Sequence, residues 1–193
     1  MCKLHLEMFR SALNKKRLQL ISGFTLIEVL VVIGILGILA TVALVAINPA
    51  EAQKKARDTQ RLKDMSTLQS IIEQYLQDNP GSGNALTGAV SLSSSTGTKV
   101  CGAGANWLTV NLFPYANVIP IDPINRPTSV TNSLGAAVPG TNAYYYFVST
   151  SAGYKLCTYM ESASNKEKIK AINDGGNNDT NFEVFSSSTI TCP

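Results

Sequence analysis

The stretch GFTLIEVL at residues 23–30 decides how this chain is organised, because it opens a long apolar run. Within residues 24–47, the polar side chains are limited to Thr25, Glu28 and Thr41. As a helix, this run is roughly 36 Å long, enough to cross the hydrocarbon core of a bilayer. The sequence therefore predicts a membrane-spanning helix over residues 24–47.

Glu28 is the feature that a simple membrane anchor does not explain. An unpaired carboxylate at the centre of a membrane helix costs about 2.5–3.5 kcal/mol. One interpretation places Glu28 near the interface, within reach of lipid headgroups. The other supplies a cation at the same depth: cleavage after Gly23 would expose the α-amino group of Phe24, which an adjacent subunit could present to Glu28.

The residues Gly23, Phe24 and Glu28, with a basic segment before them and LIEVLVVI after them, resemble the type IV pilins and the pseudopilins of type II secretion. The resemblance implies cleavage after the glycine by a prepilin peptidase and methylation of the new N-terminus. It also implies a pilin αβ-roll and a glutamate that guides docking into a filament. Ser22 before the glycine and the long leader depart slightly from the family pattern.

Charge supports the same division of the chain. The proposed leader, residues 1–23, holds five of the 16 basic residues and one of the 13 acidic residues. Lys15-Lys16-Arg17 is typical of the cytoplasmic flank of a membrane helix, so we expect the N-terminus inside. The remaining side chains sum to about −1, which gives no electrostatic case for nucleic-acid binding.

An ordinary secretory signal is an alternative, with cleavage near Ala50-Glu51-Ala52 and a mature chain starting at Gln53. The apolar run is much longer than the 7–15 residues of such a signal, and an acid lies near its start. The sequence favours the membrane anchor.

The helical pattern continues beyond the membrane segment, so we expect one long helix over residues 24–79 with a kink near Pro49. An apolar stripe follows helical spacing, and charged residues are assigned to a solvated face or to contacts with neighbouring subunits. The stripe is Ala52, Ala56, Leu62, Met65, Leu68, Ile72, Tyr75 and Leu76; the charged face is Lys54, Lys55, Arg57, Asp58, Arg61, Lys63 and Asp64.

Residues 80–193 are predicted to form an extracellular globular domain of an α+β protein, in which the helix packs on a small antiparallel sheet. Residues 80–105 are rich in small polar residues and are expected to be a loop. Two β-rich runs within 143–161 predict a hairpin, and 182–185 a third strand. The tyrosines at 144–146 are interpreted as core or sheet surface, with a ligand-stacking platform as the alternative.

Cysteines and acids give the candidate binding residues of this domain. Cys2 would leave with the leader, and among Cys101, Cys157 and Cys192 the sequence does not decide which pair forms a disulfide. Asp174, Asn177 and Asp179 lie in a glycine-containing loop whose oxygens suit calcium, with a plain turn as the alternative. No cofactor is expected to be required.

No catalytic constellation is apparent in the sequence. The single histidine, His5, lies in the leader, and the serines lack a base to activate them. We therefore expect a substrate of the prepilin peptidase rather than an enzyme.

The resemblance implies a structural subunit of a type IV pilus-like filament, with further copies, minor pilins and an inner-membrane assembly platform as partners. Its precursor would lie in the cytoplasmic membrane and its filament in the periplasm or outside the cell. One alternative is a major pseudopilin of type II secretion, whose P-x-D-P stretch resembles residues 120–123. Another is a monomeric, membrane-anchored extracellular module that binds a ligand.

Overall fold

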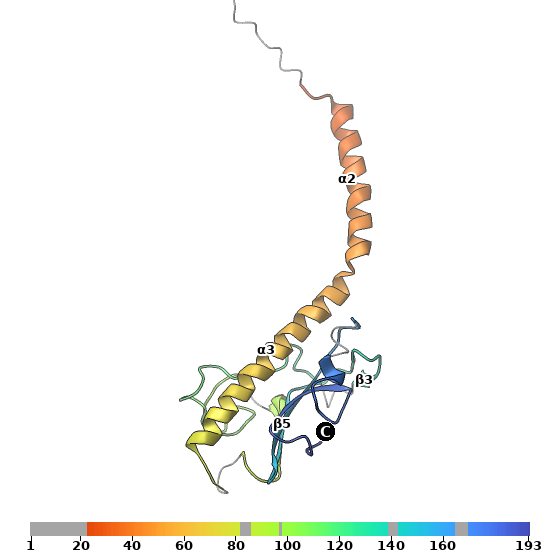
Figure 1. Cartoon of the computed structure of the whole chain (residues 1–193). Helices are drawn as coiled ribbons and strands as arrows, with labels where there is room; N and C mark the ends of the chain where they lie inside the picture. Colours follow the sequence, from red (N-terminus) through yellow and green to blue (C-terminus); the bar gives the residue numbers. More distant parts are fainter. Residues whose placement is uncertain (1–22, 82–85, 97, 139–142, 165–169) are drawn as a thin grey trace, which may run out of the picture. The chain divides into compact units, whose positions relative to one another are not determined.

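The computed structural model describes residues 23–81, 86–96, 98–138, 143–164 and 170–193. The chain divides into two compact units, residues 1–47 and residues 48–193, and Figure 1 shows the elements of each. In the first unit, α2 (Leu26–Ile47) is the described helix. In the second unit, α3 (Pro49–Asp78) precedes the strands of the globular domain.

The helical pattern breaks at Asn48, which lies between α2 and α3. Asn48 adopts a left-handed conformation with φ of 45°, and its Oδ1 accepts a hydrogen bond from the Glu51 backbone N–H at 3.3 Å. Pro49 follows as the first helical residue, where its missing N–H costs nothing. Asn48 therefore caps α3.

The main sheet has four antiparallel strands in the order β1-β4-β5-β6. Its strands are β1 (Val90–Ser93), β4 (Tyr146–Thr150), β5 (Gly153–Tyr159) and β6 (Asn181–Phe185). A 3-10 turn (Ser94–Thr96) follows β1, and β2 (Val130–Thr131) pairs with β3 (Ala137–Val138) in a separate two-stranded sheet. The prediction of an α+β fold with an antiparallel sheet is confirmed.

The segment 80–105, which we expected to be a loop, contributes a strand of the main sheet. In β1, Leu92 lies opposite Phe147 and Ser93 opposite Tyr146 of β4. The sequence did not predict this strand because the segment is rich in serine. Its residues can form a strand here because β1 lies at the edge of the sheet, where backbone hydrogen bonds to one neighbouring strand are enough.

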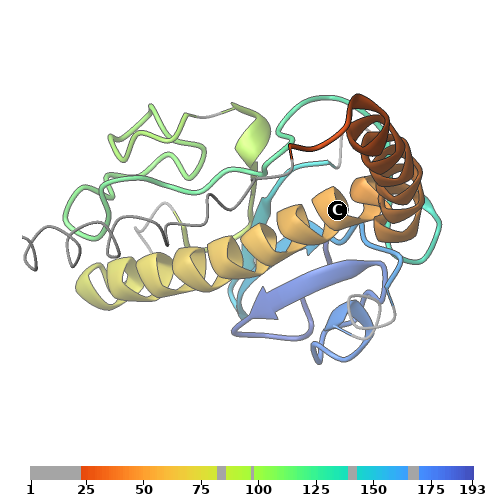
Figure 2. The same cartoon turned by 90° about the horizontal axis from the view of Figure 1, so that it is seen from above.

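One face of the sheet packs on α3, and Figure 2 shows the helix lying along it. The core of this layer holds Met65, Leu68 and Ile72 of the helix against Phe147 and Leu156 of the sheet. Strand alternation places Phe147 and Leu156 on the same face, because they are opposite each other in the register. The expected stripe is therefore buried at Met65, Leu68 and Ile72 and half-buried at Leu62, Tyr75 and Leu76, whereas Ala52 and Ala56 are exposed.

Candidate processing and assembly site

The peptide bond between Gly23 and Phe24 lies before the first turn of α2. Residues 23–25 are outside regular secondary structure, and Phe24 is 80 % exposed. A Cβ added at Gly23 would meet no atom within 4 Å. The segment therefore presents a backbone outside the helix, in which a peptidase can reach the carbonyl group without first unwinding a turn.

Glu28 and Thr25 cap the start of α2 reciprocally. The Glu28 backbone N–H donates to Thr25 Oγ1 at 3.3 Å, and Glu28 Oε2 lies 3.5 Å from both the backbone N and the Oγ1 of Thr25. This is the arrangement of a capping box, and the carboxylate also lies at the positive end of the helix dipole. The Thr-x-x-Glu spacing was a readable signal for it, which our sequence analysis missed.

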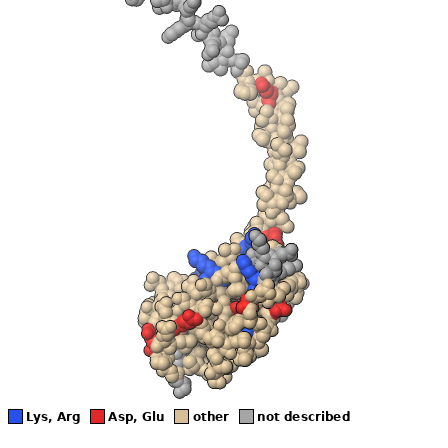
Figure 3. All heavy atoms as spheres, viewed as in Figure 1, with Lys and Arg blue, Asp and Glu red and all other residues tan. Residues whose placement is uncertain are grey.

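The surface of α2 is apolar on all sides. No residue of α2 is buried, and its 22 residues give a length of about 33 Å. The helix is long and apolar enough to cross a membrane. In Figure 3 it carries one acidic side chain near its start, which the sequence of α2 identifies as Glu28.

A family model described as the prokaryotic N-terminal methylation motif matches residues 20–44. The chain carries the prokaryotic N-terminal methylation motif. This motif is the leader signature of type IV pilins and pseudopilins, so the resemblance seen at Gly23, Phe24 and Glu28 is confirmed. Together with the apolar helix, the methylation motif supports a membrane-anchored precursor and a structural rather than enzymatic protein. Comparisons with curated proteins and with solved structures give no match.

Outside the methylation motif, Arg61 of α3 is surrounded by buried polar side chains, which together with Arg61 form the Arg61 cluster: Asp58, Asp122, Tyr159 and Glu161. The Arg61 side chain is fully buried. Its Nε donates to Asp122 Oδ2 at 2.7 Å, its Nη1 to Asp58 Oδ1 at 2.8 Å and its Nη2 to the Tyr159 hydroxyl at 2.8 Å, while Nη2 also lies 2.6 Å from Glu161 Oε1. Burial opposes the charged guanidinium, but the Asp122 carboxylate outweighs it and raises the pKa of Arg61.

The assignment of Asp58, Arg61 and Asp64 to a solvated face was therefore wrong. Asp58, Arg61 and Asp64 are buried, although Lys55 and Lys63 are exposed as expected. The reason is geometric: stepping back from Leu68 and Met65 by helical spacing leads to Arg61 and Asp58. The buried stripe of α3 thus continues through polar residues, listed in order as Asp58, Arg61, Asp64, Met65, Leu68, Ile71 and Ile72.

The segment after β5 is held to the first turns of α3 by carboxylates. Asp58 accepts hydrogen bonds from the backbone N–H groups of Glu161 and Ser162, at distances of 2.7–3.0 Å. Arg57 donates to both Glu161 oxygens, and Glu51 Oε1 accepts from the Ser162 hydroxyl at 2.6 Å. Burial works against ionisation of Glu161, but the hydrogen bond from Arg57 and the charge of Arg61 outweigh it and lower its pKa.

The contacts of Glu51 with Ser162 and Ala163 argue against the alternative of a cleaved secretory signal. Residues 50–52 form the first turn of α3, and Glu51 Oε1 accepts from the Ala163 backbone N–H at 2.7 Å. Cleavage there would require this turn to unwind and would remove both contacts. The structure thus gives the Ala50-Glu51-Ala52 stretch a role in the fold.

Asp122, the acidic residue of the P-x-D-P stretch at residues 120–123, has a structural role. Its Oδ1 accepts hydrogen bonds from the backbone N–H groups of Ile124 at 2.8 Å and Asn125 at 3.3 Å, while its Oδ2 receives Arg61. The carboxylate therefore shapes its own turn and anchors that turn to α3.

Two of the three candidate cysteines are paired. Cys157 of β5 forms a disulfide with Cys192, with a Cα–Cα distance of 6.1 Å, and Cys101 is a buried free thiol. Burial raises the pKa of Cys101, which keeps it protonated. The disulfide fastens the C-terminal segment to the sheet.

Two of the three candidate calcium ligands, Asp174 and Asn177, have other partners in this structure. Asp174 accepts from the backbone N–H groups of Gly176 and Glu183, at 2.7 and 2.6 Å. Asn177 Oδ1 accepts from the buried ammonium group of Lys155 at 2.8 Å, and Asp179 is exposed. Calcium binding by Asp174, Asn177 and Asp179 stays a prediction, in which the ion would compete with Lys155.

Proposed function

We propose that this chain is a structural subunit of a type IV pilus-like filament, processed by a prepilin peptidase after Gly23. The observation that carries the proposal is the N-terminal methylation motif on a helix with no buried residue. Such a helix needs an apolar environment, which lipid supplies to the precursor and neighbouring α2 helices would supply in a filament. Burial between helices would then contribute roughly 25 cal/mol per Å² of apolar surface removed from water.

In this proposal Glu28 changes partner. In the precursor its carboxylate faces Thr25 across the capping box. Cleavage creates a positive α-amino group at Phe24, and a neighbouring subunit would bring its own Phe24 amine to Glu28. A full ion pair between helices in an apolar environment binds more strongly than a capping contact at 3.5 Å. The pair would set the register between subunits.

The basic leader favours an orientation in which the N-terminus of the precursor lies on the cytoplasmic side of the membrane. Residues 48–193 would then lie on the opposite side. Assembly would then involve other copies of the chain, minor pilins and an inner-membrane platform, and would deliver the filament to the periplasm or the cell surface.

Mass spectrometry of the native protein tests the processing step. We expect a mature chain that starts at N-methylated Phe24. An intact leader would instead support a signal anchor, and a chain starting at Gln53 would support ordinary secretion. Either of these results would refute the proposal.

A substitution at Glu28 tests assembly separately. We expect Glu28→Ala subunits to enter the membrane and be absent from sheared filaments. Thr41→Ala is a matched control, because Thr41 is another polar residue of α2 and its hydroxyl donates only within the helix, to Ile38 O at 2.8 Å. Normal filaments from Glu28→Ala cells would overturn the assigned role of Glu28.

A major pseudopilin of a type II secretion system is the second candidate. It is favoured by residues 120–123, because Asp122 of that stretch is built into the Arg61 cluster. Loss of protein secretion, rather than loss of surface filaments, on deletion of the chain would select this candidate. A monomeric ligand-binding module would instead show low copy number and no self-association.

A further inference from the structure

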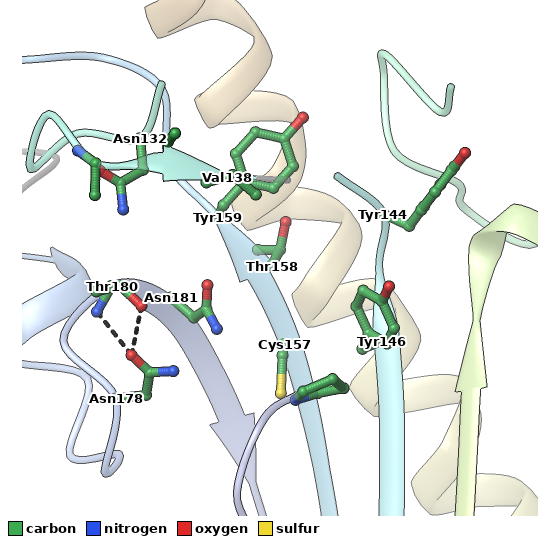
Figure 4. A pocket seen from close by; sticks show the side chains of 13 residues that line it. Asn132, Val138, Tyr144, Tyr146, Cys157, Thr158, Tyr159, Asn178, Thr180 and Asn181 are labelled. Atoms are coloured by element: carbon green, nitrogen blue, oxygen red, sulfur yellow. Dashed lines mark hydrogen bonds between the residues drawn. The ribbon is translucent and has the colours of Figure 1, made fainter. Parts of the chain in front are cut away.

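A pocket of about 140 Å³ lies at one end of the sheet, between the main sheet and the β2–β3 pair. Figure 4 shows Tyr144 and Tyr146 on one side and Asn178, Thr180 and Asn181 on the other. Asn132, Thr158, Cys157 and Pro193 also line the pocket.

The described side chains that line this pocket are uncharged. The described lining residues include no Asp, Glu, Lys or Arg side chain, although α3 nearby is rich in them. Phosphate-bearing ligands such as nucleotides are therefore disfavoured, because their recognition relies on basic side chains or helix N-termini. The lining favours a neutral ligand.

Several polar groups of the pocket have no protein partner among the described residues. The Thr158 hydroxyl is buried without a hydrogen bond, and the Asn181 carboxamide makes none. Asn132 Oδ1 accepts from the backbone N–H groups of Leu134 and Ala136, which leaves its amide nitrogen available. The pocket thus holds both donors and acceptors at fixed positions, because β5 and β6 position Thr158 and Asn181 directly.

Tyrosine rings beside carboxamides match a ligand that has an apolar face and several hydroxyl groups. A pyranose ring has both: its C–H groups can lie on an aromatic ring, and its neighbouring hydroxyls each donate and accept. We propose that this pocket binds a neutral sugar unit. Tyr144 and Tyr146 would contact the ring, and Asn132, Thr158 and Asn181 would bind its hydroxyls.

The disulfide forms part of the pocket wall. Cys157 lines the pocket, and its bond to Cys192 holds the adjoining Pro193 at the rim. The sugar site is therefore built into the oxidised protein, and the residues that form it belong to one chain.

The test uses the full chain solubilised in lauryldimethylamine oxide, since maltoside detergents would themselves present sugars. Methyl glycosides of glucose, galactose, mannose and N-acetylglucosamine are each added at about 10 mM, a concentration that detects millimolar dissociation constants. Saturation-transfer NMR reports which ligand protons approach the protein. We expect at least one glycoside to receive saturation, strongest at the C–H groups of one ring face.

Asn181→Ala is the main variant, because no hydrogen bond joins the Asn181 side chain to another residue in the part of the chain that the structure describes, whereas its backbone pairs with Tyr159. We expect it to weaken glycoside binding roughly tenfold, as for the loss of one or two hydrogen bonds. Asn173→Ala removes an exposed asparagine outside the pocket and should bind like the unaltered chain. Tyr144→Phe retains the ring and should retain most of the binding, whereas Tyr144→Ala should abolish it.

The proposal is overturned if none of the four glycosides binds. It is also overturned if Asn181→Ala and Asn173→Ala bind equally well, because binding would then occur elsewhere. Stronger binding of glucose 6-phosphate than of the neutral glycosides would show an anion site, and equal binding of phenol would show a generic aromatic site; each result contradicts the proposal.

Discussion

Arg61 and Asp122 form an ion pair that is completely enclosed by the protein. Arg61 Nε donates to Asp122 Oδ2 at 2.7 Å, and neither side chain has any exposed surface. The two residues are 61 positions apart, so the pair connects α3 to the proline-rich segment. Removal of the guanidinium would leave Asp58, Asp122 and Glu161 buried together without their shared cation.

We therefore expect Arg61→Met to lower the free energy of unfolding by about 3–5 kcal/mol. Urea unfolding of the full chain in detergent can follow the fluorescence of Trp107, the single and fully buried tryptophan. Lys63→Met is the matched control, because Lys63 is exposed on the same helix and its loss should cost within about 0.5 kcal/mol. Equal midpoints for the two variants would contradict the role of the Arg61 cluster.

The Arg61 cluster also predicts a dependence of stability on pH. The pKa of Glu161 is lower in the folded protein than its ordinary value of 4.5. A depressed carboxyl pKa stabilises the fold above the unfolded value, and this contribution is lost as the pH falls through the folded value. The difference in unfolding free energy between the unaltered chain and Glu161→Gln should therefore shrink when the pH falls below about 4.5.

Comparison with a variant is needed because other carboxyls act in the opposite direction. Burial raises the pKa of Asp64 and of Asp174, so their protonation on acidification favours the folded state. Unfolding at pH 6 and pH 3 for both proteins isolates Glu161 from these groups. A difference that stays constant between the two pH values would show that Glu161 is not the group responsible.

The disulfide should stabilise the sheet through the C-terminal segment. Cys157 and Cys192 are 35 positions apart, so Cys192→Ala should cost about 2–4 kcal/mol. Peptide mapping under non-reducing conditions should recover Cys157 linked to Cys192. Cys101 should react with iodoacetamide only after unfolding, because it is buried. A peptide linking Cys101 to either partner would disprove this pairing.

Calcium binding can be tested by replacing Lys155, whose ammonium group would compete with the ion for Asn177 Oδ1. Lys155 Nζ lies 2.8 Å from Asn177 Oδ1 and 2.9 Å from Glu183 Oε2. If calcium occupies this loop, Lys155→Met should increase the rise in melting temperature caused by calcium, because the ammonium group no longer competes. Melting curves with 5 mM calcium chloride or with a chelator measure this rise.

The control for the calcium experiment is Lys63→Met, which should leave the calcium-dependent rise unchanged. Asp179→Asn should reduce the rise, since it removes a carboxylate ligand. The calcium prediction fails if the unaltered chain, Lys155→Met and Lys63→Met all show the same response to calcium and chelator.

Sequence alone was sufficient for the features that depend on neighbouring residues. The apolar helix α2, the methylation motif and the β4–β5 hairpin follow from apolar composition, a short motif and strand patterns within a few residues. Even here the capping contact of Thr25 with Glu28 was overlooked, although its spacing was readable. The strand at 90–93 escaped because small polar residues carry little strand signal.

The tertiary structure decided the features that depend on partners far along the chain. Arg61 is buried because Asp122 and Glu161 come to it from distant segments and compensate for its loss of hydration. In the same way Lys155 reaches the oxygen-rich loop, and Cys157 meets Cys192 rather than Cys101. Local sequence determined the methylation motif and the apolar helix α2. Long-range packing determined which charges are buried and which cysteines pair, because the free energy of a buried charge depends on the groups around it, and these were fixed only by folding.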